Sequence, residues 1–378
     1  MDFELSKAEK LLQSSVTAWL ARTCPPARVR ALIETPGACD EALWEGLAEQ
    51  GWTSLTLGEK VGGMGLGAVQ LAAVAEAMGA ACLPGPWLAT VWASAVLAAA
   101  DEDRHADLLG AVVEGKASLA VGLLEESARW DAEAVGLRAV AENGGLSLSG
   151  TKLFVDGAMA AGTFLLAVRE GGELVLVLVP REAPGVTVVP APAIDLTRPI
   201  ARVDLKDVRV DAAAVVARGE AAKAALAAGT RLATVAICAE LVGGMGWALA
   251  DSVEYAKTRQ QFGRPIGAFQ AVQFMCAEML VRVESARSIA YAAAWAVGAE
   301  DPAAERLLAA AKTYCSDAAR EVGNLAVQLH GGIGFTWEHD LNLYYRRFKG
   351  SEIAFGDATF HRETVARLVI DPHRPKET

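Results

Sequence analysis

The residues best suited to chemistry lie together in one short stretch, RQQFGR, at positions 259–264. Arg259 and Arg264 carry planar guanidinium groups, which match the oxygens of a phosphate or carboxylate in pairs. Gln261 adds an amide, and Phe262 adds an aromatic ring. These side chains indicate a site for a ligand that carries both phosphates and a flat ring. The alternative interpretation is a solvated corner between two helices.

The pattern on both sides of this stretch predicts two long helices joined at an exposed elbow. Apolar residues recur at helical spacing before the stretch, at Ala248, Leu249, Val253 and Tyr255. The same spacing returns after it, at Phe269, Val272, Met275, Cys276 and Met279. Gly263 and Pro265 mark the turn between the two patterns. We therefore expect the elbow to present its polar side chains at the junction of the two helices.

Three stretches of the chain, in this order, resemble the signature of the acyl-CoA dehydrogenase family of flavoenzymes. They are WEGLAEQGWTSLTLGEKVGGMGLG at 44–67, YAKTRQQFGRPIGAFQAVQFMCAEM at 255–279, and QLHGGIGF followed by LYYRRFK at 328–349. The resemblance covers nearly the whole chain. It implies FAD as cofactor, an acyl-CoA substrate, an electron-transferring flavoprotein or similar acceptor, and a homo- or heterotetramer with another acyl-CoA dehydrogenase subunit. No strand precedes the GGMGLG run, so a Rossmann loop is not predicted there.

The resemblance divides the flavin contacts into two groups. Residues expected to hold the FAD of a neighbouring subunit match the family, namely Arg259, Gln261, Phe262, Gln270, Gln328, Gly331 and Gly332. Phe154 and Val155 fall where the family holds the flavin of its own subunit, with Asp156 in place of a threonine. The stretch LLEESARWD at 123–131 lacks the pattern of the TEPxAGSD-like loop expected there. The residues expected to bind the neighbouring subunit's flavin therefore match the family better than those expected to bind this chain's own flavin.

The carboxylate that removes the α-proton of the thioester in this family is missing from its usual position. Phe355 occupies that position, and Ala233 or Thr230 occupies the position that some relatives use instead. Glu240, about two helical turns beyond Ala233, and Asp357 are the remaining candidate bases. The alternative for Glu240 is a buried ion pair with an arginine of the bundle. The alternative for Asp357 is a cap on the last helix.

Three hypotheses for the function therefore stay open. The chain is a working dehydrogenase with a displaced base, or a non-catalytic subunit whose partner supplies the base and the flavin-holding β domain. In the third hypothesis it runs flavin chemistry that needs no α-proton base. Heteromeric members of the family that act on bulky acyl-CoA, such as steroid side chains, resemble the second case.

Composition limits the other classes of function. The net charge of -11 over 378 residues argues against nucleic acid or an anionic membrane as the main partner. The six cysteines show no CxxC pair and no cluster with histidine, which predicts no metal site and reduced thiols in a cytoplasm. The apolar stretch 232–250 is interrupted by Glu240 and by glycines, so we expect a buried helix there and no membrane span.

The pattern along the chain predicts three domains. These are an N-terminal helical domain at 1–115, a middle β-barrel domain at 116–215, and a C-terminal four-helix bundle at 216–378. A hairpin at 143–145 and strands at 150–155 and 174–179 are expected in the β domain. Four helices, at 220–257, 269–297, 302–328 and 341–370, are expected in the bundle.

Overall fold

The computed structural model describes residues 5–142 and 144–370, and the chain folds into two compact units. The first, called here the helical unit, consists of Met1–Pro26, Ala68–Leu83 and Thr234–Thr378. The second, called the sheet unit, consists of Ala27–Gly67 and Pro84–Ala233. Segments from both halves of the chain are therefore interleaved, and the three domain boundaries expected from composition stay a prediction.

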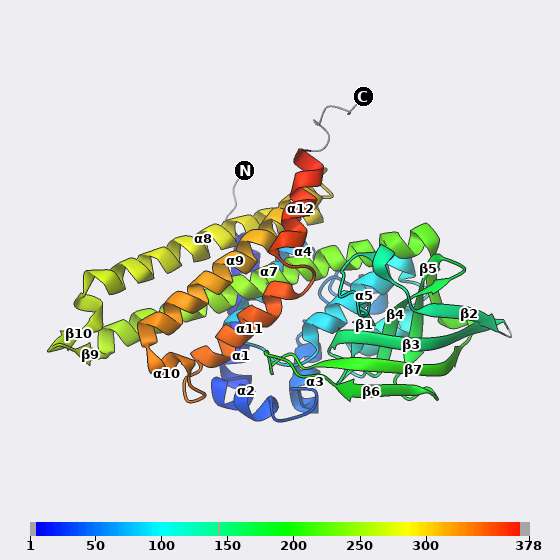
Figure 1. Cartoon of the computed structure of the whole chain (residues 1–378), viewed down its shortest axis with the longest axis horizontal. Helices are drawn as coiled ribbons and strands as arrows, with labels where there is room; N and C mark the ends of the chain where they lie inside the picture. The colour runs from blue at the N-terminus through cyan, green and yellow to red at the C-terminus, as the bar shows by residue number, and fades with distance from the viewer. Residues whose placement is uncertain (1–4, 143, 371–378) are drawn as a thin grey trace. The chain divides into compact units, whose positions relative to one another are not determined.

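The helical unit is built on long helices that pack along their lengths (Figure 1). α8 packs on α9, and α11 and α12 pack on α9 as well, while α4 lies between α1 and α8. The bounds of these elements are α1 (Lys7–Thr23), α4 (Ala68–Ala80), α7 (Gly219–Thr258), α8 (Gln270–Gly298), α9 (Ala304–His330), α10 (Gly332–Phe335), α11 (Leu341–Ile353) and α12 (Ala358–Val369). Of α7, the part from Thr234 onward belongs to the helical unit. The helical domain predicted at the C-terminal end is confirmed.

Two glycines allow α4 and α7 to cross at close range. A Cβ atom added at Gly79 would lie 2.1 Å from the carbonyl oxygen of Glu240, and one at Gly243 would lie 1.8 Å from that of Glu76. Any larger residue would force the two backbones apart, because real Cβ atoms do not approach backbone so closely. Gly243, one of the glycines that interrupt the apolar stretch 232–250, therefore serves helix packing.

The last predicted helix is broken, which corrects the expected single helix at 341–370. α11 ends at Ile353, and α12 begins at Ala358 with Asp357 as its N-cap. Phe355 and Gly356 between them adopt φ angles of 58° and 95°. An α-helix cannot continue through residues with positive φ, so the chain turns here.

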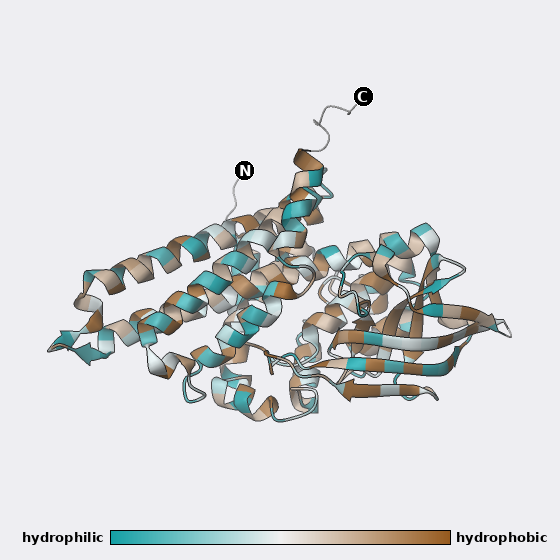
Figure 2. Ribbon diagram, in the orientation of Figure 1, coloured by the Kyte–Doolittle hydropathy of each residue, from teal (hydrophilic) through white to brown (hydrophobic). Residues whose placement is uncertain are grey.

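The elbow between α7 and α8 has the predicted form. The short strands β9 (Gln260–Gln261) and β10 (Arg264–Pro265) pair antiparallel, and η4 (Ile266–Ala268) leads into α8. Figure 1 shows the hairpin at one end of the bundle, and Figure 2 shows that it is hydrophilic. The expected exposed turn between two long helices is confirmed.

The sheet unit contains one sheet of eight strands, β1 (Leu119–Gly122), β2 (Arg138–Glu142), β3 (Gly145–Asp156), β4 (Thr163–Glu170), β5 (Glu173–Pro180), β6 (Val186–Pro190), β7 (Ile200–Val210) and β8 (Val215–Arg218). The strand order is β6-β7-β3-β2-β4-β5-β8, with β1 parallel to β4. The predicted β domain is present as this sheet. Its edge strands β6 and β8 do not pair with each other within the described residues, so the hydrogen-bonding path is open.

Local patterns predicted several strands of this sheet correctly. The 143–145 hairpin joins β2 to β3, with Glu142 opposite Gly145, although Asn143 lies outside the described residues. The LVLVLV run at 174–179 forms most of β5 and is buried. The strand expected at 150–155 is the second half of β3, which runs without a break from Gly145. The remaining elements of the sheet unit are α2 (Pro26–Leu32), α3 (Glu41–Glu49), α5 (Trp87–Asp101), α6 (Ala106–Val113) and the short helices η1 (Glu59–Val61), η2 (Ala132–Ala134) and η3 (Ala212–Ala214).

Among the described residues, α7 is the one helix that is long and apolar enough to cross a membrane. Of its most apolar 18-residue window, 78% is buried inside the protein. The helix therefore has the character of a core helix, as the interrupted apolar stretch predicted.

Candidate functional site

The elbow presents the first group of predicted cofactor contacts. The Ile266 N–H donates to the Arg259 carbonyl at 2.8 Å and closes the turn. Arg259, Gln261 and Phe262 are exposed. Within the described part of the chain, the Arg259 guanidinium forms no hydrogen bond or ion pair. It is therefore a cation that is available to a phosphate from another molecule.

The aromatic ring of Phe262 is the most exposed large apolar side chain of the elbow. It is 91% exposed, and its backbone has a φ of 55°. Positive φ is uncommon outside glycine, and such strained residues gather at binding sites. Arg264 is engaged locally, because its guanidinium lies 4.2 Å from the centre of the Phe269 ring. The elbow thus leaves Arg259 and Phe262 free for a ligand with a phosphate and a flat ring.

The second group of predicted contacts lies where α9 ends. Gln328 is exposed on the last turn of the helix, and Gln270 is exposed at the start of α8. Gly331 has a φ of 66°, which favours glycine. A Cβ atom added at Gly331 or Gly332 would meet no other atom within 4 Å. The surface over both glycines is therefore open to a phosphate group. The hydrogen-bond donors of the elbow and of the α9 end fit FAD. Arg259 suits one of its phosphates, and the backbone at Gly331 and Gly332 lets a phosphate approach closely.

The residues predicted to hold this chain's own flavin lie in an irregular part of β3. The register between β3 and β7 shifts between Lys152 and Val155. Phe154 adopts a φ of 52° within this irregularity, and its side chain is 50% exposed. Val155 packs in the core of the sheet unit, so only its backbone is left for a cofactor. The irregularity turns an aromatic ring outward, as bulges do beside binding sites.

The stretch 123–131 is fixed to the same strand by a buried ion pair. The Lys152 ammonium donates to the Glu125 carboxylate at 2.5 Å and to the Leu123 carbonyl at 3.3 Å. The Leu153 N–H donates to the Leu124 carbonyl at 2.8 Å. Burial lowers the pKa of Lys152. Burial alone raises the pKa of Glu125, but its contacts with Lys152 and two backbone N–H groups outweigh burial and lower it. These contacts hold the stretch beside the strand that carries Phe154.

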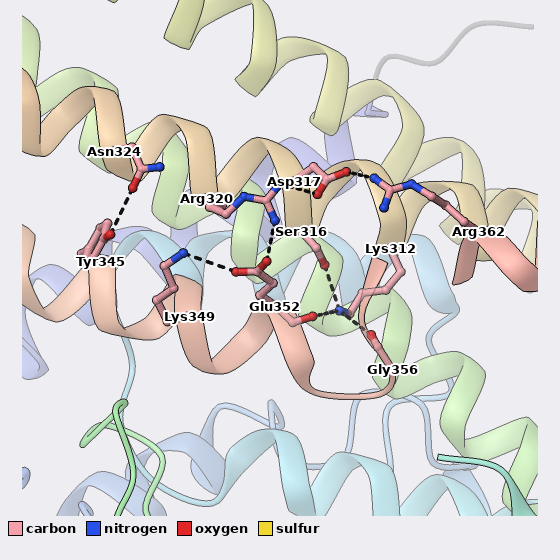
Figure 3. A network of polar contacts seen from close by, with 10 residues as sticks. All are labelled: Lys312, Ser316, Asp317, Arg320, Asn324, Tyr345, Lys349, Glu352, Gly356 and Arg362. Atoms are coloured by element: carbon pink, nitrogen blue, oxygen red, sulfur yellow. Dashed lines mark hydrogen bonds and ion pairs between the residues drawn. The ribbon is translucent and has the colours of Figure 1, made fainter. Parts of the chain in front are cut away.

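The region of the missing base is centred on Phe355 and Gly356. Phe355 is 5% exposed, so the position of the usual glutamate is filled by a buried ring. The Lys312 ammonium of α9 donates to the carbonyls of Glu352 and Gly356, each at 3.0 Å, and to the Ser316 hydroxyl at 2.9 Å (Figure 3). Lys312 therefore fixes the turn between α11 and α12 through backbone oxygens.

Two basic groups beside this turn have lowered pKa values. Burial lowers the pKa of Lys312 to about 8. Burial also lowers the pKa of His361 to about 4, even though its Nε2 contacts the Phe355 carbonyl at 2.9 Å. Near neutral pH the His361 ring is therefore uncharged, and Nε2 carries the proton that the carbonyl accepts.

Both candidate bases have structural contacts. The Glu240 carboxylate accepts from Arg347 Nη1 at 2.9 Å, and both side chains are 4% exposed. This is the buried ion pair that the alternative interpretation of Glu240 predicted. Asp357 accepts a hydrogen bond from the Phe360 N–H at 2.8 Å and caps α12. This is the helix cap that the alternative interpretation of Asp357 predicted.

The two other base positions carry no carboxylate. Ala233 is completely buried in α7. Thr230 accepts a hydrogen bond from the Trp92 indole at 3.1 Å.

Comparisons with known proteins agree with the fold and the motifs. The family model "Acyl-CoA dehydrogenase, N-terminal domain" matches residues 6–116, and "Acyl-CoA dehydrogenase, C-terminal domain" matches residues 220–370. The chain is 32% identical over 352 residues to acyl-CoA dehydrogenase IpdE2 of Mycobacterium tuberculosis, covering 90% of this chain and 91% of that protein. The chain belongs to the acyl-CoA dehydrogenase family.

Several solved structures have a similar fold. The ChsE4-ChsE5 complex from Mycobacterium tuberculosis has a TM-score of 0.89 and 30% identity, covering 99% of this chain and 100% of the matched chain. A variant of the Tcur3481-Tcur3483 steroid ACAD has a TM-score of 0.87 and 29% identity, covering 97% and 99%. PigA with FAD and proline has a TM-score of 0.88 and 25% identity, covering 98% and 99%.

The acyl-CoA dehydrogenase family is a family of oxidoreductases that bind FAD.

The sequence analysis missed several of the residues that shape the candidate site. The missed residues are Lys312, Lys152 and His361. Each is a buried polar residue that contacts either backbone carbonyls or a carboxylate far away in the sequence. The only signal in the sequence was a charged or imidazole side chain within an apolar segment.

Proposed function

We propose that this chain takes part in the FAD-dependent α,β-dehydrogenation of an acyl-CoA thioester as the base-lacking subunit of a heteromeric acyl-CoA dehydrogenase. The state of the candidate base positions carries this proposal. Phe355 has no group that accepts a proton. Glu240 is held in a buried ion pair, and Asp357 caps a helix. Neither carboxylate is held ready for the α-proton of a substrate.

The exposed flavin contacts support a role toward a partner's cofactor. When bound, FAD supplies the acceptor for the β-hydrogen of the substrate. Arg259 would bind one of its phosphates, and Phe262 would cover a flat part of the molecule. Gly331 and Gly332 would let a phosphate approach the backbone. Phe154 and Val155 carry no hydrogen-bonding side chain for a flavin of this chain's own.

The compositions of two similar structures favour a mixed assembly. The ChsE4-ChsE5 complex and the Tcur3481-Tcur3483 steroid ACAD are each named for two components. We infer a heterotetramer with another acyl-CoA dehydrogenase subunit, a bulky acyl group such as a steroid side chain, and an electron-transferring flavoprotein as acceptor. A cytoplasmic location suits this chemistry, and no disulfide joins the six cysteines.

The test compares the chain produced alone with the chain produced together with a candidate partner subunit of the acyl-CoA dehydrogenase family. Flavin per chain is measured by absorbance after gel filtration, and assembly mass by light scattering. Turnover is measured with a dye acceptor on straight-chain and steroid side-chain CoA thioesters. We expect the chain alone to lack tightly bound FAD and activity, and the complex to hold one FAD per two chains.

Two outcomes would overturn the proposal. One tightly bound FAD per chain in an active homotetramer would make this chain a working dehydrogenase with a displaced base. Flavin reduction by a CoA thioester without loss of its α-hydrogen would indicate different flavin chemistry. Loss of the α-hydrogen is followed by mass spectrometry of the product from an α-deuterated thioester, so the two outcomes are separable.

A further inference from the structure

Three side chains from separate elements of the helical unit meet in one cluster. Asp251 lies on α7, His330 is the last residue of α9, and His339 lies between α10 and α11. Asp251 Oδ2 is 3.2 Å from His330 Nε2 and 3.9 Å from His339 Nε2. One ligand atom of each residue lies within 4.8 Å of the other two. This group is called the Asp–His–His cluster below.

Two atoms of the cluster are buried without a hydrogen-bond partner. His330 Nε2 and Asp251 Oδ2 are both buried, and neither forms a hydrogen bond with any described residue. Their contact at 3.2 Å lacks hydrogen-bond geometry. Buried polar atoms are nearly always satisfied, so this pair calls for a group that contacts both atoms.

The tautomer of His330 suits a cation in this position. His330 Nδ1 lies 2.8 Å from the Ala326 carbonyl, which only accepts, so Nδ1 carries the proton of the neutral ring. Nε2 then turns a lone pair toward a carboxylate oxygen. A histidine that donates one N–H to a backbone carbonyl and offers the other nitrogen is the usual arrangement at metal sites.

The spacing of the atoms matches a tetrahedral divalent cation. Zinc binds imidazole nitrogen at about 2.0–2.1 Å and carboxylate oxygen at about 2.0–2.2 Å, which places neighbouring ligand atoms about 3.3 Å apart. The observed 3.2 Å separation of Asp251 Oδ2 and His330 Nε2 fits this value. His339 Nε2, at 3.9 Å from Asp251 Oδ2, would have to move closer to bind the same ion. Two imidazoles and one carboxylate are ligands that Zn²⁺ prefers.

The surroundings of the cluster hold the buried ligand and leave an entry path. The Tyr255 ring lies against His330, with ring centres 4.4 Å apart. The side chain of His330 is fully buried, whereas those of Asp251 and His339 are 28% and 20% exposed. His339 Nδ1 accepts from the Leu341 N–H at 3.2 Å, so His339 must give up this bond to bind through Nε2. His339 is therefore the weakest of the three ligands.

We propose that Asp251, His330 and His339 bind one divalent transition-metal ion of the Zn²⁺ type. The ion would link α7, four residues before Tyr255 and the elbow, to the end of α9, immediately before Gly331. Both segments carry the predicted contacts to FAD, so the ion would fix their separation. The proposal concerns metal binding alone and stands whether or not the chain lacks a catalytic base.

The test uses the full chain without a polyhistidine tag, after dialysis against a chelator. Co²⁺ is titrated as the probe, because its visible absorption reports tetrahedral ligands, and Zn²⁺ is then added to displace it. We expect one saturable Co²⁺ per chain with tetrahedral bands that Zn²⁺ abolishes. Zn²⁺ should also raise the melting temperature, because it binds only the folded cluster.

Single substitutions locate the ion. Asp251→Asn and His330→Gln should each weaken Co²⁺ binding at least about tenfold, with His339→Gln the mildest of the three. His105→Gln, in the sheet unit, should leave binding unchanged. The absence of saturable binding to the parent chain, or equal binding by His330→Gln and the parent, would overturn the proposal. If His330→Gln does not fold, the partly exposed Asp251→Asn decides the result.

Discussion

Arg347 reaches Glu240 across the interior of the helical unit and joins residues 107 positions apart in the chain. Its other terminal nitrogen donates to the Leu83 carbonyl at 2.8 Å. One guanidinium thus ties together α7, α11 and the end of the segment that carries α4. The pair explains how a glutamate is accommodated in one of the most apolar helices of the chain.

Breaking this pair from one side should destabilise the helical unit strongly. Glu240→Gln or Arg347→Met leaves one buried charge without its partner, which typically costs about 3–5 kcal/mol. Hydrogen exchange of peptides from α7 and α11 measures the loss. Glu278→Gln is the control, because the Glu278 side chain is 59% exposed and its pair with Arg282 is 3.8 Å long. We expect less than about 1 kcal/mol there.

The same variants separate a structural role of Glu240 from a catalytic one. The double variant Glu240→Leu with Arg347→Met should recover much of the lost stability, because no unpaired charge remains. A catalytic Glu240 would instead show a turnover loss of about 10²–10⁴-fold that the second substitution does not recover. Full stability of Glu240→Gln would contradict the structural account.

Arg259 should contribute to flavin binding and little to folding. Arg259→Ala removes an exposed guanidinium without a partner in the described residues, so the melting temperature should stay within about 1 °C of the parent. Flavin retained by the complex with the partner subunit after gel filtration should fall. Lys257→Ala, two residues away and paired with Glu254 at 2.6 Å, is the matched control. Equal flavin retention by both variants would remove Arg259 from the site.

Lys312 should hold the turn in which Phe355 replaces the usual glutamate. Lys312→Met leaves the buried carbonyls of Glu352 and Gly356 without a donor, at a cost of about 1–3 kcal/mol for each. Amides of residues 354–358 should exchange faster. Lys349→Met is the control within the same network (Figure 3), because its 3.5 Å contact with Glu352 is partly exposed. Unchanged exchange in Lys312→Met would contradict this role.

Features set by neighbouring residues could be predicted from the sequence. Gly263 and Pro265 marked the elbow, and the unbroken apolar run LVLVLV marked β5. The break before Asp357 was missed because Phe355 is not a residue type that favours positive φ; only Gly356 gave a local signal.

For features that depend on residues distant in sequence, the sequence predicted at most the type of partner and not its identity. The pattern around Glu240 indicated an arginine partner but did not identify which one. The Asp–His–His cluster brings together Asp251, His330 and His339, which share no spacing motif, and no metal site was expected. The interleaving of segments in the two units likewise arises from tertiary packing, which local periodicity does not contain.

The stability of the segment around α12 should depend on pH through His361. Burial lowers its pKa to about 4 in the folded chain, against about 6.5 when unfolded. Between these values the unfolded chain binds a proton that the folded chain does not, so stability is fully present above pH 6.5 and falls toward pH 4. The full effect of this shift is about 3 kcal/mol.

Hydrogen exchange of α12 peptides in the parent and in His361→Gln isolates this contribution. Glutamine retains an N–H that can donate to the Phe355 carbonyl but does not titrate. Carboxylates that titrate in the same range are common to both chains and cancel in the difference. The parent should therefore lose stability relative to His361→Gln as the pH falls from 6.5 to 4. Parallel stability curves over this range would show that the His361 ring is protonated as readily in the folded chain as in the unfolded one.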